Sequence, residues 1–173
     1  MAYVQMGWLP RMLVDKGVGE NTASVALAII GVFNIAGGVI MPWLISRLDR
    51  LAPVPVVLAL CTCAGWAGVL LAADAAPLAW ASLMGIGGMC FPLALALLTA
   101  RTRSALTTAR LSGFVQPGGY ILAGLVPLLV GVVRGATGNW TAVLMGLMVL
   151  SLCMLVAGLR ATARVYIDDE LVS

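Results

Sequence analysis

The chain has 173 residues, of which 62% are apolar and only 10% are charged, and it contains no histidine. Because a soluble domain is roughly 45–50% apolar and about 25% charged, this composition excludes an ordinary soluble protein and indicates an integral membrane protein. The ten basic residues lie between apolar runs and form no patch, so the formal net charge of +3 does not indicate a nucleic-acid partner.

Apolar runs divide the chain into six segments. The first, 1-MAYVQMGWLPRMLV-14, is too short to cross a bilayer and resembles a helix whose beginning is missing. A spanning helix needs about 20 apolar residues, and five later stretches reach that length: 23–46, 54–73, 77–100, 111–133 and 140–160. We therefore expect an all-α polytopic membrane helical bundle over residues 1–160, followed by a tail over residues 161–173.

The connections between these segments alternate between two sides, and basic residues are divided unequally between the sides. One side holds seven of the ten, namely Arg47, Arg50, Arg101, Arg103, Arg110, Arg160 and Arg164. The other side holds Arg11, Lys16 and Arg134. Because the side richer in lysine and arginine faces the cytoplasm, we expect a multi-pass protein of the cell membrane with a cytoplasmic C-terminus.

Polar residues are segregated among the spans. The spans over 54–73 and 140–160 are almost entirely aliphatic or aromatic, so we expect them to face lipid or to lie at the periphery. The other three spans are rich in glycine, contain proline and include the strongly polar Asn34 and Gln116. Polar residues inside spans typically face the bundle interior or a water-filled cavity, so these three spans are expected to line a cavity.

A short internal repeat links the second and fifth segments. Asn34 in 31-GVFNIAGG-38 holds the same place as Gln116 in 113-GFVQPGGY-120, with glycines three residues to either side of each amide. Since an odd number of crossings separates the two copies, we expect two inverted three-helix repeats, over 1–74 and 75–160. Inverted repeats with interrupted helices and a midplane site are typical of secondary transporters.

The repeat also has a simpler explanation. Small residues let helices approach closely, and an amide can hydrogen bond to a neighbouring helix without any role in transport. The run Pro117-Gly118-Gly119 favours the first interpretation, because proline removes a backbone donor and glycine weakens a helix. We expect the helix to be loosened there, facing protein or a cavity where a break is tolerated.

Other kinds of chemistry find little support. The four cysteines, Cys61, Cys63, Cys90 and Cys153, lie inside apolar segments without metal-ligand spacing, and we expect them to be packing residues. No carboxylate lies near the centre of a span, so a proton-coupling carboxylate is missing from these segments. With no serine–histidine or metal constellation, we expect no enzymatic activity, no metal and no cofactor.

Five stretches together resemble a known family. The chain resembles the C-terminal half of a major facilitator superfamily transporter of the cyanate and 2-nitroimidazole transporter family, on the stretches 8-WLP-10, 47-RLDR-50, 85-GIGGMCFPLAL-95, 110-RLSGFVQPGGYILAGLVPLLVG-131 and 137-TGNWT-141. The family pattern after the glutamine is similar to Ser-Val-Gly-Tyr, whereas this chain has Pro-Gly-Gly-Tyr. We therefore expect the local helix geometry to differ from that of the family.

The resemblance implies a place for each segment. The six segments would be the last six of twelve helices, with the chain starting inside the seventh and the third and sixth of the half lying outside the cavity. It implies transport of a small solute by alternating access, together with an N-terminal six-helix half absent from this chain, or with a second copy. The alternative is a non-transporting membrane protein, either an orphan fragment or a scaffold that binds membrane partners.

The candidate pathway residues come from three segments. Asn34, Gln116 and Tyr120 are the strongest, and Gln116 and Tyr120 are four residues apart and share a helix face. The first segment adds Tyr3, Gln5 and Trp8, of which the last two share a face. Trp8 is alternatively an anchor at the membrane interface. Arg11 either steers an anion or snorkels to the outer boundary.

One charged connection is a candidate gate. Arg47, Asp49 and Arg50 resemble the short charged loop between the second and third helices of a superfamily half, where they would gate the cytoplasmic side. The alternative is that these charges only set the orientation of the chain in the membrane.

Overall fold

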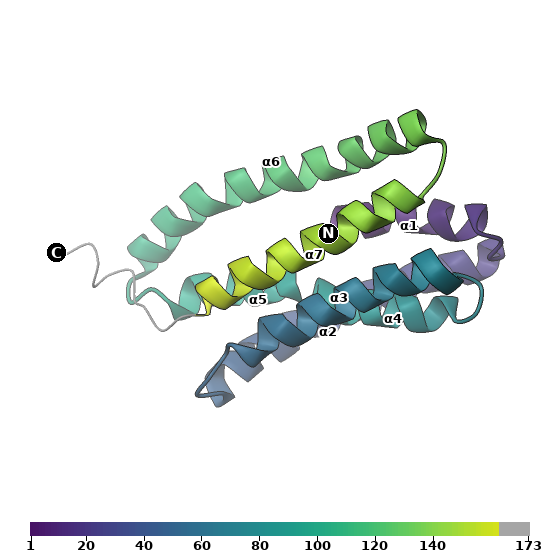
Figure 1. The fold of residues 1–173 in the computed structure, drawn as a ribbon. Helices are drawn as coiled ribbons and strands as arrows, with labels where there is room; N and C mark the ends of the chain where they lie inside the picture. The colour runs from purple at the N-terminus through teal and green to yellow at the C-terminus, as the bar shows by residue number, and fades with distance from the viewer. Residues whose placement is uncertain (163–173) are drawn as a thin grey trace.

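The computed structural model describes residues 1–162, so all but the first two residues of the expected tail over 161–173, Arg164 included, lie outside the described residues. The regular structure within residues 1–162 is entirely helical (Figure 1). It comprises α1 (Ala2–Asp15), α2 (Glu20–Arg47), α3 (Pro53–Ala72), α4 (Pro77–Gly88), α5 (Cys90–Ala100), α6 (Ala105–Thr137) and α7 (Thr141–Ala161). The predicted all-α class is confirmed.

Five helical stretches are long and apolar enough to cross a membrane: α2, α3, the α4–α5 pair, α6 and α7. They correspond to the five predicted spans. The largest difference is at the start of α6, where the Ser104 hydroxyl accepts a hydrogen bond from the Thr107 N–H at 3.0 Å and begins the helix at Ala105. Helix α1 has 14 residues and begins about halfway along the bundle (Figure 1).

The expected interruption at Pro117-Gly118-Gly119 is wrong. Helix α6 continues through these residues for 33 residues, because an unpaired backbone group is costly in lipid and a single proline removes only one donor. The interruption lies instead at Met89, between α4 and α5. Two glycines precede it, and Pro92 has no N–H to donate to the carbonyl of Gly88, which explains the break.

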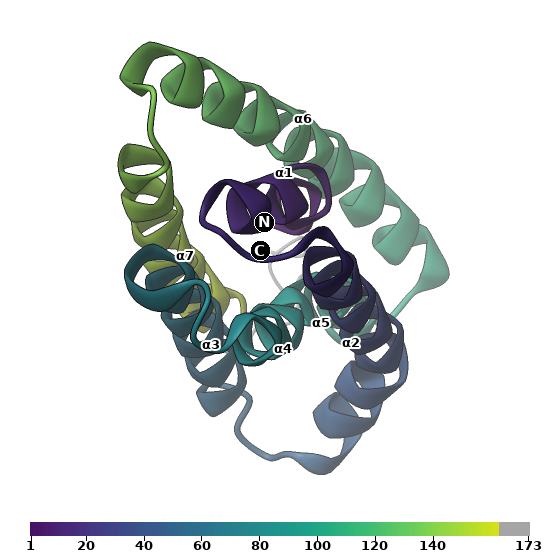
Figure 2. The same cartoon turned by 90° about the vertical axis from the view of Figure 1, so that its right-hand side faces the viewer.

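Helices α2, α3, α4, α6 and α7 surround α1 when the bundle is viewed from the end where α1 stops (Figure 2). The core is closed by large buried side chains, including Leu9 and Met12 of α1, Trp66 of α3, Met84 of α4 and Leu144 of α7. These residues fix α1 against the remaining helices over its second half.

Glycines bring α3 and α4 together. A Cβ on Gly68 would overlap the Trp80 ring, and a Cβ on Gly87 would overlap the Thr62 hydroxyl. Such close contact explains why half of the α3 span is buried, whereas only 6% of the α6 span is. Helix α3 is therefore the most buried of the five spans within residues 1–162, and the expectation that its remaining face meets lipid stays a prediction.

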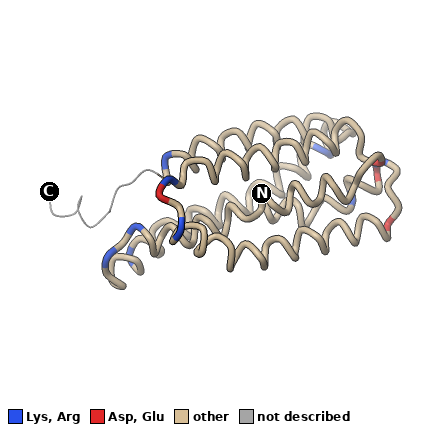
Figure 3. The backbone as a smooth tube through the Cα atoms, turned by 90° about the horizontal axis from the view of Figure 1, so that it is seen from below, with Lys and Arg blue, Asp and Glu red and all other residues tan. Residues whose placement is uncertain are grey.

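The charges lie at the two ends of the bundle (Figure 3). One end holds the arginines of the α2–α3 and α5–α6 connections and the end of α7. The opposite end holds Asp15, with which Arg11 and Arg134 pair, and the neighbouring Lys16. The helix directions thus gather the basic residues on two sides, as the alternating connections predicted. Which end faces the cytoplasm stays a prediction.

Candidate functional site

Two hollows open at the start of α1. The first, here called the α6 hollow, has a volume of about 300 Å³ and is lined by Tyr3, Phe91, Gln116 and Tyr120 among others. The second, the α2 hollow, has a volume of about 720 Å³ and is lined by Tyr3, Asn34 and Phe91 among others. Because Tyr3 and Phe91 line both, the hollows are neighbours. The structure thus brings four of the six candidate pathway residues to one region.

The unbroken helix α6 positions two of these residues. Gln116 and Tyr120 are one turn apart and both reach the α6 hollow, as their spacing predicted. The start of α5, directly after the interruption at Met89, supplies Phe91 to the same wall. None of the side chains lining this hollow carries a charge, and its polar side-chain groups are two tyrosine hydroxyls, one amide and a thiol.

The two amides of the repeat differ in their surroundings. The Asn34 Nδ2 donates to the Ile30 carbonyl at 2.9 Å, one turn back in α2. The same amide packs against Gly88, where a Cβ would come within 3.2 Å of it. Gln116 faces the α6 hollow, and no described residue hydrogen bonds to its side chain. Gln116 is therefore the freer of the two amides to bind a solute.

Gln5 and Trp8 lie away from both hollows. Gln5 is fully buried, and its Nε2 is 3.4 Å from the Met84 carbonyl oxygen that accepts from it. The Trp8 Nε1 donates to the Pro127 carbonyl at 3.0 Å, and its ring stands edge-on to the ring of Trp140 at 5.8 Å between centroids. Both side chains join helices in this conformation, so their part in a pathway stays a prediction.

The charged connection after α2 lies at the opposite end from Trp8. Arg47, Asp49 and Arg50 are exposed, and the Arg47 guanidinium lies 5.9 Å from the centre of the Trp43 ring. Asp49 and Arg50 line a shallow hollow with Thr162 at the end of α7. The shared hollow places the connection near the end of the last helix, and a gating role stays a prediction.

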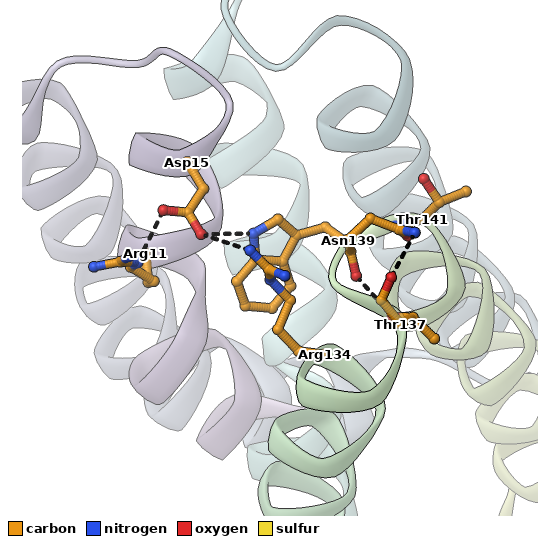
Figure 4. Close-up of polar contacts among 7 residues, drawn as sticks. Arg11, Asp15, Arg134, Thr137, Asn139 and Thr141 are labelled. Atoms are coloured by element: carbon orange, nitrogen blue, oxygen red, sulfur yellow. Dashed lines mark hydrogen bonds and ion pairs between the residues drawn. The ribbon is translucent and has the colours of Figure 1, made fainter.

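Sequence reasoning missed a polar cluster at the end of α1, here called the Asp15 cluster (Figure 4). It is formed by Arg11, Asp15, Arg134 and Trp140. The Asp15 carboxylate accepts from the Trp140 Nε1 at 3.0 Å and pairs with the Arg11 Nε at 2.9 Å. It also lies 3.5 Å from an Arg134 nitrogen, and the Arg134 guanidinium is 4.9 Å from the centre of the Trp140 ring.

This cluster gives the motif 137-TGNWT-141 a physical role. Gly138 ends α6 with a left-handed φ of 69°, and the Asn139 Oδ1 accepts from the Thr141 N–H at 3.0 Å (Figure 4). The turn thereby places Trp140 at the start of α7 with its indole toward α1. The signal in the sequence was that Asp15 and Arg134 end two segments on the same side of the bundle.

The electrostatics keep Asp15 ionised. Asp15 lies at the end of α1, outside the five spans. The hydrogen bond from Trp140 lowers the pKa of its carboxyl below the usual value, and Arg11 and Arg134 add to this effect against an opposing desolvation. Arg11, which the sequence assigned to snorkelling or anion steering, is mostly exposed but is paired with Asp15.

Comparisons with curated proteins find several relatives. The chain is 34% identical to the 2-nitroimidazole transporter of Escherichia coli over 160 residues, which are 92% of this chain and 40% of that protein. It is 30% identical to the cyanate transport protein CynX of the same organism over 78% of this chain and 35% of that protein. It is 40% identical to a putative anionic 4-hydroxy-benzoate permease of Thauera aromatica over 58% of this chain and 70% of that protein.

The chain therefore spans about 40% of the length of the first two relatives. No protein-family model matches the chain. No solved structure matches it either.

Proposed function

The chain belongs to the cyanate and 2-nitroimidazole transporter family of the major facilitator superfamily, and we propose that it moves a small solute across a membrane by alternating access. It does so as a six-helix half, rocking against a second six-helix unit. The two triplets over 1–74 and 75–160 are proposed to be its inverted repeats. The N-terminal half of a longer transporter, or a second copy of this chain, provides the other unit.

The convergence of Tyr3, Gln116 and Tyr120 on the α6 hollow is the observation that carries this proposal. Tyr3 comes from α1 and the other two residues from α6, so the site exists only because the two helices pack together. An amide both donates and accepts, and a phenol does the same. These groups hold a small polar solute inside a membrane without the large cost of a buried charge.

The exposed faces of α2 and α6 support the second unit. Both helices carry large apolar side chains that are mostly exposed, such as Ile35 at 78% and Phe114 at 85%. On the proposed arrangement these faces meet lipid and the partner half. The arginine-rich end is cytoplasmic, where Arg47, Asp49 and Arg50 gate access. The site then opens alternately toward the two sides.

The experiment that tests this proposal is uptake by a chimera. The chain replaces the aligned 160 residues of the Escherichia coli 2-nitroimidazole transporter, and cells are offered cyanate, 2-nitroimidazole and 4-hydroxybenzoate in turn. Uptake of at least one solute above that of cells with empty vector is expected. Uptake of none, with the chimera present in the membrane at normal abundance, contradicts the transport proposal.

Substitutions then test the site. Gln116→Leu is expected to lower uptake per molecule at least tenfold while leaving abundance in the membrane unchanged, and Asn34→Leu to lower it less. Cys153→Leu is the matched control, because Cys153 is exposed on α7 and lines neither hollow. A purely structural amide predicts otherwise, since interhelical hydrogen bonds in membranes average only about 0.6 kcal/mol. Normal uptake by both amide variants would remove the site assignment.

A further inference from the structure

Asp15 is the single acceptor on which three donors from three helices converge. Arg11 belongs to α1, Arg134 to the last turn of α6, and Trp140 to the start of α7. Guanidinium and indole groups only donate, so none of the three can replace Asp15 as the acceptor. Replacing Asp15 by a residue without a carboxylate therefore breaks its contacts with Arg11, Arg134 and Trp140.

The contact with Trp140 is the one best protected from water. Trp140 is 6% exposed, whereas the Arg11 side chain is 70% exposed and the Arg134 side chain 30%. An exposed ion pair contributes little. A buried indole N–H that loses its acceptor is left unsatisfied, and that is costly. The bond between Asp15 and Trp140 is accordingly the main link, and Arg134 reinforces it through the carboxylate and through the Trp140 ring.

The same face of α1 continues this link along α6. About two turns before Asp15, the Trp8 ring lies where a Cβ on Gly131 would come within 3.2 Å. Its Nε1 donates to the Pro127 carbonyl, and its ring touches Trp140. Helix α1 is therefore held against α6 and α7 over its last two turns, and its opposite end carries Tyr3 into both hollows.

We infer that Asp15 is a positioning residue for transport: it holds the end of α1 to the corner between α6 and α7 and so fixes the place of Tyr3 in the solute site. Tyr3 and Asp15 are twelve residues apart in one helix, a separation of about 18 Å along its axis, so a movement of its held end is passed to the other end. This inference rests on the proposed function, because it assigns Tyr3 to the solute site.

The test of the link itself does not depend on transport. Thermal midpoints of the chain in mild detergent are measured for Asp15→Asn, Trp140→Phe and the double variant, with Asp74→Asn as control. Asp74 is an exposed carboxylate at the same end of the bundle. Asp15→Asn and Trp140→Phe are each expected to lower the midpoint, and the double variant to lower it no further than the larger single effect. Additive shifts, or an effect of Asp74→Asn equal to that of Asp15→Asn, would overturn the link.

The test of positioning uses the chimera and the concentration dependence of uptake. Tyr3→Phe is expected to raise KM several-fold, and Asp15→Asn about tenfold, with Asp15→Glu between wild type and Asp15→Asn. In the Asp15→Asn background, Tyr3→Phe is expected to raise KM less than twofold. Residues this far apart ordinarily have independent effects, so this loss of the Tyr3 effect is the signature of positioning.

These measurements distinguish a positioning role of Asp15 from a merely structural one. A merely structural Asp15 lowers abundance but leaves KM per molecule and the Tyr3 effect unchanged, which would overturn the inference. Should Asp15→Asn fail to reach the membrane, the same comparison is made with Asp15→Glu. If the chimera transports no solute while the thermal cycle is non-additive, the proposed function fails and the link between α1 and Trp140 stands without a role in transport.

Discussion

Gly87→Ala tests whether close contact between α3 and α4 sets the stability of this bundle. A Cβ at residue 87 would overlap the Thr62 hydroxyl and lie 2.8 Å from the Leu58 carbonyl oxygen. Thr62 is 1% exposed and donates to that same carbonyl at 2.9 Å. The new methyl group therefore has to displace a buried hydrogen-bonded side chain or push the two backbones apart.

The magnitude follows from two costs and one opposing gain. Overpacking a well-filled interior costs about 1–3 kcal/mol, and displacing the Thr62 hydroxyl from its acceptor adds about 1 kcal/mol. Replacing glycine by alanine inside a helix returns about 1 kcal/mol. We expect Gly87→Ala to lower the free energy of unfolding by about 1–3 kcal/mol in total, as an order of magnitude from these terms.

Gly146→Ala is the matched control, because residue 146 lies inside α7 and an added Cβ there would meet nothing within 4 Å. Only the gain in helix propensity from glycine to alanine applies, so this variant is expected to be as stable as wild type or slightly more stable. Unfolding of both variants is followed by circular dichroism during titration with a denaturing detergent. If Gly87→Ala unfolds at the same detergent fraction as Gly146→Ala, the argument from close packing is refuted.

Three further predictions concern topology, autonomy and pH. In a background without native cysteines, Ser104→Cys should resist an impermeant thiol reagent added outside intact cells and Thr137→Cys should react, and the reverse pattern means the orientation is inverted. The 173-residue chain alone in liposomes should show no solute uptake above protein-free liposomes, because one copy supplies one wall of a cavity; uptake there would mean that a second copy provides the other wall. The difference in thermal midpoint between wild type and Asp15→Asn should be constant from about pH 8 to pH 5 and shrink below about pH 4. A carboxyl with a lowered pKa stabilises above its unfolded pKa, and this contribution is lost as the pH falls through the folded pKa.

The all-α class, the five spans and their approximate positions were accessible from the sequence alone. A run of about 20 apolar residues can adopt few structures in a bilayer, and a helix is favoured because it pairs each backbone group within itself. The same requirement for pairing explains why the expected interruption of the helix at Pro117-Gly118-Gly119 was wrong. The residues there weaken a helix, but the requirement for pairing keeps α6 continuous, and the break falls at Met89, where two glycines and Pro92 act together.

The candidate site could be predicted only in part from the sequence. The spacing of Gln116 and Tyr120 on one helix face could be predicted, because it depends on the period of the helix. That Tyr3 joins them, while Asn34 lines the neighbouring hollow and Gln5 is buried against Met84, depends on how α1 is placed among the other helices.

The Asp15 cluster was decided by the tertiary structure alone. Asp15 is separated from Arg134 by 119 residues and from Trp140 by 125. Charge counting placed Arg11 and Arg134 on one side of the membrane, but that side covers a large area, and hydrogen bonds form only within about 3.5 Å. Side-chain packing, through Trp8 against Gly131 and Trp140, brings these groups within that distance, and no local pattern in the sequence encodes it.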